Sequence, residues 1–79
     1  MDYKKVKINL NSTDRIKKFI QTTRRFMSDI DIMTDRACID AKSVLGIYAL
    51  DLSKDVYVRI ISNDVSECRK FYAEMEEFR

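Results

Sequence analysis

The sequence predicts a two-layer α+β fold, in which helices cover one face of a four-stranded antiparallel sheet. Four segments alternate apolar with polar residues, and other segments repeat apolar residues at helical spacing, in the order β-α-β-β-α-β-α. The chain has 79 residues, with one glycine and no proline to mark a linker. We therefore expect residues 1–79 to form a single domain.

The first strand and the first helix are predicted from the first third of the chain. Val6, Ile8 and Leu10 alternate with polar residues, which is typical of a strand with one buried face. Polar residues that favour helix N-caps then precede a helix predicted over residues 13–27. The predicted core-facing positions of this helix are Ile16, Phe19, Ile20, Thr23, Phe26 and Met27.

The next two strands form a predicted hairpin. Ile30 and Ile32 alternate with polar neighbours in the second strand, and residues 34–36 make a tight turn. One face of the third strand is formed by Ala37, Ile39 and Ala41.

A short helix, a fourth strand and a final helix complete the chain. Ser43 precedes an apolar run over residues 44–50, and a serine N-cap favours a short helix there over a strand. The buried face of the fourth strand is Val56, Val58 and Ile60. Asn63 or Asp64 caps the final helix. Its apolar stripe is Val65, Cys68, Phe71, Tyr72, Met75 and Phe78.

Composition argues against an enzyme, a metal site and a cofactor site. The chain has no histidine, and its single glycine, Gly46, excludes a glycine-rich phosphate loop. Cys38 and Cys68 lack the spacing of zinc and redox motifs, so we expect two reduced thiols. The charged segment 1–7 is not followed by the apolar run of a signal peptide or membrane span. The expected location is the cytoplasm.

Charge is distributed unevenly along the chain. Residues 1–25 hold eight lysines and arginines against two aspartates, whereas residues 26–79 hold more acids than bases. The basic face of the predicted first helix contains Lys17, Lys18, Arg24 and Arg25. Such a face is either simply solvated, or it binds an acidic protein partner or nucleic acid. No aromatic residue stands among these cations for base stacking, which disfavours nucleic acid.

Three segments resemble one known family: Ile20-Gln21-Thr22, Ser28-Asp29-Ile30 and Lys42-Ser43-Val44-Leu45-Gly46-Ile47. They are similar to the first helix, the second strand and the regulatory-serine segment of HPr, the phosphocarrier of the phosphotransferase system. The similarity runs from about Ser12 to Phe78 without a gap and keeps the element order. It implies an HPr-like open-faced two-layer β-sandwich with strand order 1-4-2-3.

The chain departs from the family at the active-site loop. Ser12 stands at the position of the family's phosphorylated histidine, Asp14 at that of its arginine, and Arg15 at that of a proline. Histidine suits phosphate relay because its phosphoramidate is labile and its pKa lies near neutrality. A serine phosphate ester is too stable for onward transfer, and an aspartate repels the phosphoryl group. We therefore expect neither a phosphocarrier role nor a catalytic residue.

The resemblance also implies a role for Ser43. In Gram-positive relatives a kinase phosphorylates the corresponding serine, and the product binds a transcriptional repressor. A histidine-less branch, the catabolite repression HPr-like proteins, keeps only this role. Ser43 is thus a candidate modification site, with Lys42 adjacent to share the phosphate charge. The alternative is that its hydroxyl serves only as a helix cap.

Two surfaces are candidates for partner contact. The residues expected to bind a partner at the first surface are Arg15, Lys17, Lys18, Val44, Leu45 and Tyr48. The apolar members match the family's docking patch, although an ordinary core would also explain them. On the uncovered face of the sheet we expect Met33, Cys38, Tyr57 and Ile61. These are either scattered apolar residues or the surface of a homodimer or other partner.

The leading hypothesis is a non-catalytic, HPr-like regulatory or protein-interaction module. Its expected partner is a kinase, a transcription regulator or a component of the phosphotransferase system. The alternative is a structural or nucleic-acid-associated module that has kept only the fold. Nucleic acid that co-purifies and leaves with salt would favour the alternative.

Overall fold

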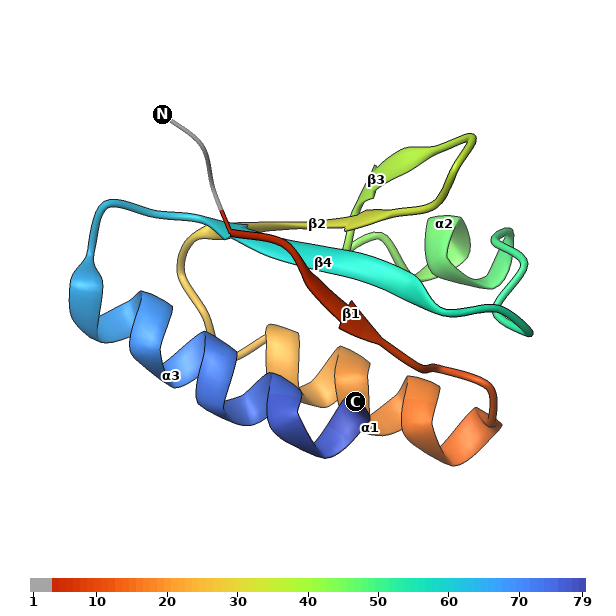
Figure 1. Ribbon diagram of the computed structural model, residues 1–79, viewed down its shortest axis with the longest axis horizontal. Coiled ribbons are helices and arrows are strands. Elements are labelled where there is room, and N and C mark those ends of the chain that lie inside the picture. Colours follow the sequence, from red (N-terminus) through yellow and green to blue (C-terminus); the bar gives the residue numbers. More distant parts are fainter. Residues whose placement is uncertain (1–3) are drawn as a thin grey trace.

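The computed structural model describes residues 4–79 and shows a sheet with helices packed on one face (Figure 1). The first three residues of the charged segment 1–7 lie outside the described part. The elements are β1 (Val6–Ile8), α1 (Thr13–Thr23), β2 (Asp29–Met33), β3 (Cys38–Asp40), α2 (Val44–Tyr48), β4 (Val56–Ile61), α3 (Val65–Met75) and the 3₁₀ helix η1 (Glu76–Phe78). The predicted order β-α-β-β-α-β-α is confirmed, and η1 extends the last helix.

The sheet has the strand order β1-β4-β2-β3, and every neighbouring pair is antiparallel. Its register aligns one row of side chains across all four strands: Val6, Val58, Ile32 and Ile39. Because successive side chains of a strand point to opposite faces, this row fixes which residues face the helices. The strand order 1-4-2-3 implied by the family resemblance is confirmed.

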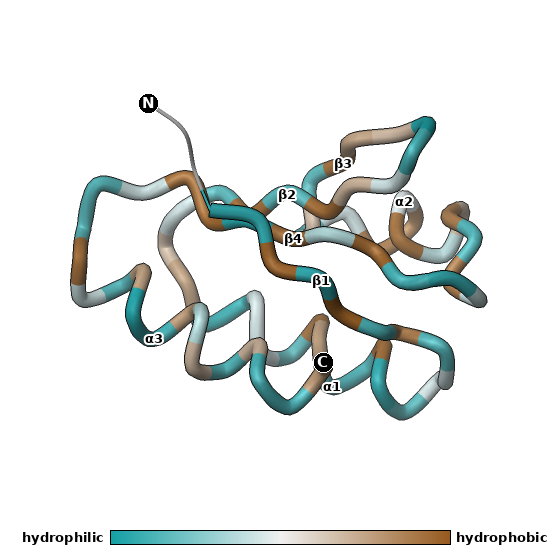
Figure 2. Tube along the Cα trace, in the orientation of Figure 1, coloured by the Kyte–Doolittle hydropathy of each residue, from teal (hydrophilic) through white to brown (hydrophobic). Residues whose placement is uncertain are grey.

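The core lies between the aliphatic face of the sheet and the aromatic stripes of α1 and α3. Phe19 of α1 meets Phe78 edge to face, with ring centroids 5.7 Å apart. Phe26 meets Phe71 of α3 in the same geometry at 5.7 Å. Figure 2 shows hydrophobic and hydrophilic residues alternating along β1, as expected for a strand with one face on a core. The predicted packing role of these phenylalanines is confirmed, because all four are buried.

The first helix ends earlier than predicted, and Met27 does not reach the core. The amide of Arg25 donates to the Thr22 carbonyl and that of Phe26 to the Thr23 carbonyl, both at 3.2 Å. These i to i−3 bonds tighten the last turn and take the chain out of the helix. Phe26 still packs inside, whereas Met27 is 91% exposed. The prediction that Met27 belongs to the core stripe is wrong.

The last helix begins as predicted but exposes its first apolar residue. The Asp64 carboxylate accepts hydrogen bonds from the amides of Ser66 and Glu67, so Asp64 rather than Asn63 is the N-cap. Val65 is 64% exposed because it occupies the first helical position, immediately after the cap and outside the packed layer. Its assignment to the apolar stripe is therefore wrong.

The tight turn predicted between the second and third strands is present. Thr34 Oγ1 accepts hydrogen bonds from the amides of Arg36 and Ala37, which fixes the turn predicted over residues 34–36.

Within residues 4–79, the helices are too short and too polar for any to span a bilayer.

Candidate protein-interaction site

The start of α1 and the short helix α2 lie at the same end of the molecule (Figure 1). A side-chain hydrogen bond of 3.0 Å joins this region: Asn9 Nδ2, in the loop before α1, donates to Asp55 Oδ1, in the loop before β4. Asn9 Oδ1 in turn accepts from the Asn11 amide at 3.0 Å. The loop that precedes α1 is therefore tied to the rest of the fold by Asn9.

Ser12 serves as the N-cap of α1. Its backbone is extended, with φ −140° and ψ 155°, and its Oγ accepts a hydrogen bond of 3.2 Å from the Arg15 amide. Asp14 lies in the first turn, where a carboxylate favours the positive end of the helix dipole. A serine and an aspartate at these positions thus have a structural explanation that involves no phosphate.

Arg15 is occupied by contacts within the chain. Its Nε donates to the Asn9 carbonyl at 2.8 Å, and its guanidinium lies 6.0 Å from the centroid of the Phe78 ring. The side chain is half-buried. The sequence predicts that Arg15 binds a partner. In the structure its side chain contacts Asn9, in the loop before α1, and Phe78, near the C-terminus.

Two ion pairs with acids of the C-terminal helices α3 and η1 neutralise part of the predicted basic face. Lys18 Nζ lies 2.7 Å from Glu77 Oε2, and Arg25 Nη2 lies 3.3 Å from Glu74 Oε2. Such exposed pairs each contribute about 0–1 kcal/mol to stability. Lys17 is exposed and makes no ion pair within residues 4–79. Of the three cations predicted to bind a partner, only Lys17 is free of such contacts in the described chain.

Ser43 caps α2 as predicted. Its Oγ accepts a hydrogen bond of 3.4 Å from the Gly46 amide. A Cβ added at Gly46 would lie 3.1 Å both from Ile39 Cδ1 and from Ser43 Oγ, so a glycine allows α2 to approach β3. Lys42 Nζ donates to the Phe26 carbonyl at 2.8 Å. Lys42 is therefore engaged with the end of the first helix instead of standing free beside Ser43.

The exposed face of α2 is apolar. Leu45 is 85% exposed and Tyr48 is 52% exposed, whereas Ile47 is fully buried and anchors the helix. Residues three apart on a helix are surface neighbours, so Leu45 and Tyr48 form one patch. Val44 is half-buried beside it. A helix of five residues cannot bury all of its apolar side chains, as expected from the sequence.

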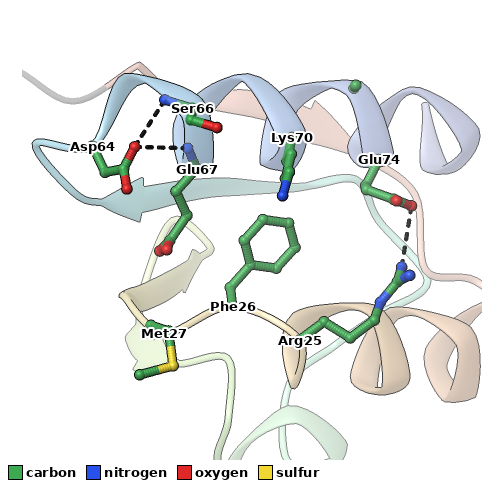
Figure 3. Close-up of a pocket in the computed structure, with 9 residues that line it drawn as sticks. Arg25, Phe26, Met27, Asp64, Ser66, Glu67, Lys70 and Glu74 are labelled. Carbon is green, nitrogen blue, oxygen red and sulfur yellow. Dashed lines mark hydrogen bonds and ion pairs between the residues drawn. The ribbon is translucent and has the colours of Figure 1, made fainter.

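A hollow that the sequence did not predict lies between the end of α1 and the first half of α3 (Figure 3). It has a volume of about 630 Å³ and is lined by Arg25, Phe26, Met27, Asp64, Ser66, Glu67, Lys70, Ala73 and Glu74. Its acids already have partners: Asp64 caps α3, Glu67 accepts from the Ser28 amide, and Glu74 pairs with Arg25. Lys70 points toward the Phe26 ring in Figure 3. The hollow is therefore a seam between the helices whose three acids already have partners within the chain.

Among residues 4–79, the pKa values of two titratable groups are shifted, and both groups lie outside the site. The hydroxyl and the amide of Ser53 donate to Asp51 and lower the pKa of that carboxyl below its usual range. Burial raises the pKa of Tyr72, whose hydroxyl donates to the Lys4 carbonyl at 2.6 Å. Within residues 4–79, no three histidine, cysteine, aspartate or glutamate side chains gather in a way that suits a metal ion.

The sequence and the fold match known proteins of one kind. The family model described as "PTS HPr component phosphorylation site" matches residues 13–78, which is most of the chain. The chain belongs to the HPr family. The match begins directly after Ser12 and includes all of α1, α2 and α3. The proteins of this family are phosphocarriers of the phosphotransferase system, and they act by binding other proteins.

Solved HPr structures have the same fold. HPr-C-His from Thermoanaerobacter tengcongensis has a TM-score of 0.73 and 24% identity, over 98% of this chain and 93% of its own. The phosphocarrier protein HPr from Bacillus anthracis has a TM-score of 0.71 and 22% identity, over 99% of this chain and 96% of its own. A search of curated protein sequences found no match. At this identity the structural likeness shows the HPr fold, while residue roles must be argued from this chain.

Proposed function

We propose that this HPr-family chain is a non-catalytic, cytoplasmic regulatory or protein-interaction module. It binds its partner through the apolar patch of Leu45 and Tyr48 on α2, with the exposed cation Lys17 of α1 as a further contact. The observation that carries the proposal is the exposure of that patch, 85% for Leu45 and 52% for Tyr48. Two neighbouring large apolar side chains in water form a candidate contact surface, because burying them against a partner removes apolar area from water.

The chemistry of the α1 terminus supports a role without phosphate relay. The 79 residues contain no histidine, so no imidazole is available to take up or release a phosphoryl group. Ser12 Oγ accepts from the Arg15 amide, and the Arg15 guanidinium is bound to Asn9 and Phe78. Within residues 4–79 the Ser12 hydroxyl has no side-chain base as a hydrogen-bond partner, and the cation of the same turn, Arg15, is already engaged.

Ser43 is the proposed modification site of this module. Its hydroxyl is exposed and precedes the Leu45–Tyr48 patch by two residues. A phosphate there would add roughly two negative charges at pH 7 beside an apolar docking surface. Because Lys42 is bonded to the Phe26 carbonyl, it would have to leave that bond to neutralise the phosphate. Modification therefore changes the charge of the patch and selects a different partner.

The partner belongs to one of three classes: a component of the phosphotransferase system, a serine kinase, or a transcription regulator. The experiment measures binding of the purified chain to enzyme I, to an HPr serine kinase and to a repressor that binds serine-phosphorylated HPr. Leu45→Arg should abolish the interaction with whichever of these binds. Val65→Arg is the matched control, because Val65 is also an exposed apolar residue, at 64%, but lies at the start of α3.

Equal loss of binding in the two variants would refute docking through α2. Binding to none of the three proteins by the wild-type chain would refute the proposed partner class. Circular dichroism should show both variants folded, since neither side chain is part of the buried core.

A further inference from the structure

The face of the sheet opposite α1 and α3 carries two rows of side chains that cross all four strands and a shorter third row, in which Ile61 of β4 stands opposite Asp29 of β2. The register aligns the first row as Lys7, Tyr57, Met33 and Cys38. The second row is Lys5, Arg59, Asp31 and Asp40, in which Lys5 stands just before β1. Lys5 and Lys7 flank Val6, which packs against the core, so both lysines belong to the open face. The face is thus built from one largely apolar row, one charged row and the short Ile61–Asp29 row at its edge, and the first two rows carry the argument.

The charged row runs from two cations to two anions. Arg59 Nε and Nη2 each lie 3.1 Å from Asp31 Oδ2, and both side chains are about three-quarters buried. Asp40 stands directly opposite Asp31 in the register and makes no ion pair within residues 4–79. Its Oδ1 accepts the Lys42 amide at 2.8 Å. Like charges directly opposite each other on neighbouring strands are destabilising. Lys5, at the other end of the row, likewise makes no ion pair within residues 4–79.

We infer that this open face is a self-association surface, on which two copies of the chain stack sheet to sheet. The two-fold axis lies parallel to the strands and passes between β4 and β2, the middle strands of the sheet. This operation places β1 of one copy over β3 of the other. It reverses the charged row, so that Lys5 meets Asp40 of the second copy and Arg59 meets Asp31 of the second copy. Because the row has two cations at one end and two anions at the other, each cation then faces an anion of the second copy.

The centre of the apolar row is self-complementary under the same operation, which places Lys7 over Cys38 of the second copy at the two ends of the row. Tyr57 is placed over Met33 of the second copy, close to the axis, and the contact occurs twice. Tyr57 is 43% exposed and Met33 is half-buried in the single chain. A methionine sulfur makes favourable contacts with an aromatic ring. Stacked sheets keep their strand directions within about 30°, which preserves the approximate match of the rows.

The expected dimer is weak. Strands lie about 4.8 Å apart and rise about 3.4 Å per residue, so four strands and the six residues of β4 give roughly 400 Å² per copy. Stable complexes bury about 800 Å² per partner. The association should therefore depend on protein concentration, and salt should weaken it because charged contacts contribute. This surface is separate from the Leu45–Tyr48 patch, so the inference does not depend on the proposed function.

The test is an exchange of charges followed by sedimentation equilibrium over a range of concentrations. Lys5→Asp alone sets two acids over each other at both ends of the dimer, and Asp40→Lys alone sets two bases over each other. Each variant should raise the dimer Kd by about tenfold or more, because each reversal acts twice. An equimolar mixture of the two variants should form a heterodimer, in which opposite charges face each other again at both ends.

The controls separate association from folding. Asp40→Asn keeps an oxygen for the Lys42 amide, removes the charge and should weaken the dimer less than Asp40→Lys. Lys17→Asp changes an equally exposed cation on α1 and should leave Kd unchanged. A wild-type chain that stays monomeric at high micromolar concentration overturns the inference. So does a mixture of the two charge-reversed variants that associates no better than either alone.

Discussion

Removal of the Ser43 hydroxyl tests whether that residue is a helix cap and separates this role from signalling. In Ser43→Ala the Gly46 amide loses its acceptor, and the loss of an N-cap typically costs about 1 kcal/mol. The hydrogen bond is long, at 3.4 Å, and the helix has only five residues. We therefore expect a loss at the lower end, about 0.5–1 kcal/mol in the free energy of unfolding.

The assay is urea and thermal unfolding followed by circular dichroism. A loss of 0.5–1 kcal/mol corresponds to a fall in Tm of roughly 2–8 °C for a domain of this size. Ser43→Asp should retain wild-type stability, because aspartate is an equally good N-cap. Ser12→Ala provides the comparison: its cap bond is 3.2 Å and belongs to the 11-residue helix α1, so its cost should be larger.

Two results would refute this reasoning. A Ser43→Ala loss well above 2 kcal/mol would mean that Ser43 does more for the fold than cap a short helix. A Ser43→Asp variant as unstable as Ser43→Ala would mean that the side-chain acceptor is not what stabilises α2. With the cap role established, any change in partner binding by Ser43→Asp at unchanged stability reports on charge at the docking patch.

Three further predictions concern the core and the charged surface. Phe19→Ala should destabilise the fold by about 3–5 kcal/mol in urea unfolding, since Phe19 is fully buried against Phe78. The raised pKa of Tyr72 predicts stability that is complete below pH 10.0 and falls as pH rises further, and Tyr72→Phe should remove this part of the alkaline loss. A double-mutant cycle on Lys18 and Glu77 should give a coupling of about 1 kcal/mol or less that vanishes in high salt.

Sequence patterns predicted the strands and the helix starts well because these signals are local. Alternation gave the bounds of β4, and the caps Ser12, Ser43 and Asp64 mark three helix starts. The end of α1 had no such signal, since neither glycine nor proline follows it. The spacing of Met27 continued the helical pattern, and only the tightened last turn, set by tertiary packing, directs it outward.

The site was harder to predict because its geometry depends on contacts between distant segments. Nothing near Arg15 in the sequence indicates that its guanidinium lies over Phe78 or that Asn9 accepts its Nε–H. Likewise, the pairing of Lys18 with Glu77 requires α1 and α3 to lie side by side. The Leu45 and Tyr48 patch was predictable, since a five-residue helix anchored by Ile47 must leave its other side in water.

The central claim is that this HPr-family chain binds partners without relaying phosphate. The most direct measurement is incubation of the purified chain with enzyme I and labelled phosphoenolpyruvate, with a histidine-containing HPr as the positive control. We predict that the control acquires acid-labile label and that this chain acquires none, because it has no histidine and its Ser12 hydroxyl is used as a cap. Acid-labile label on this chain would contradict the account.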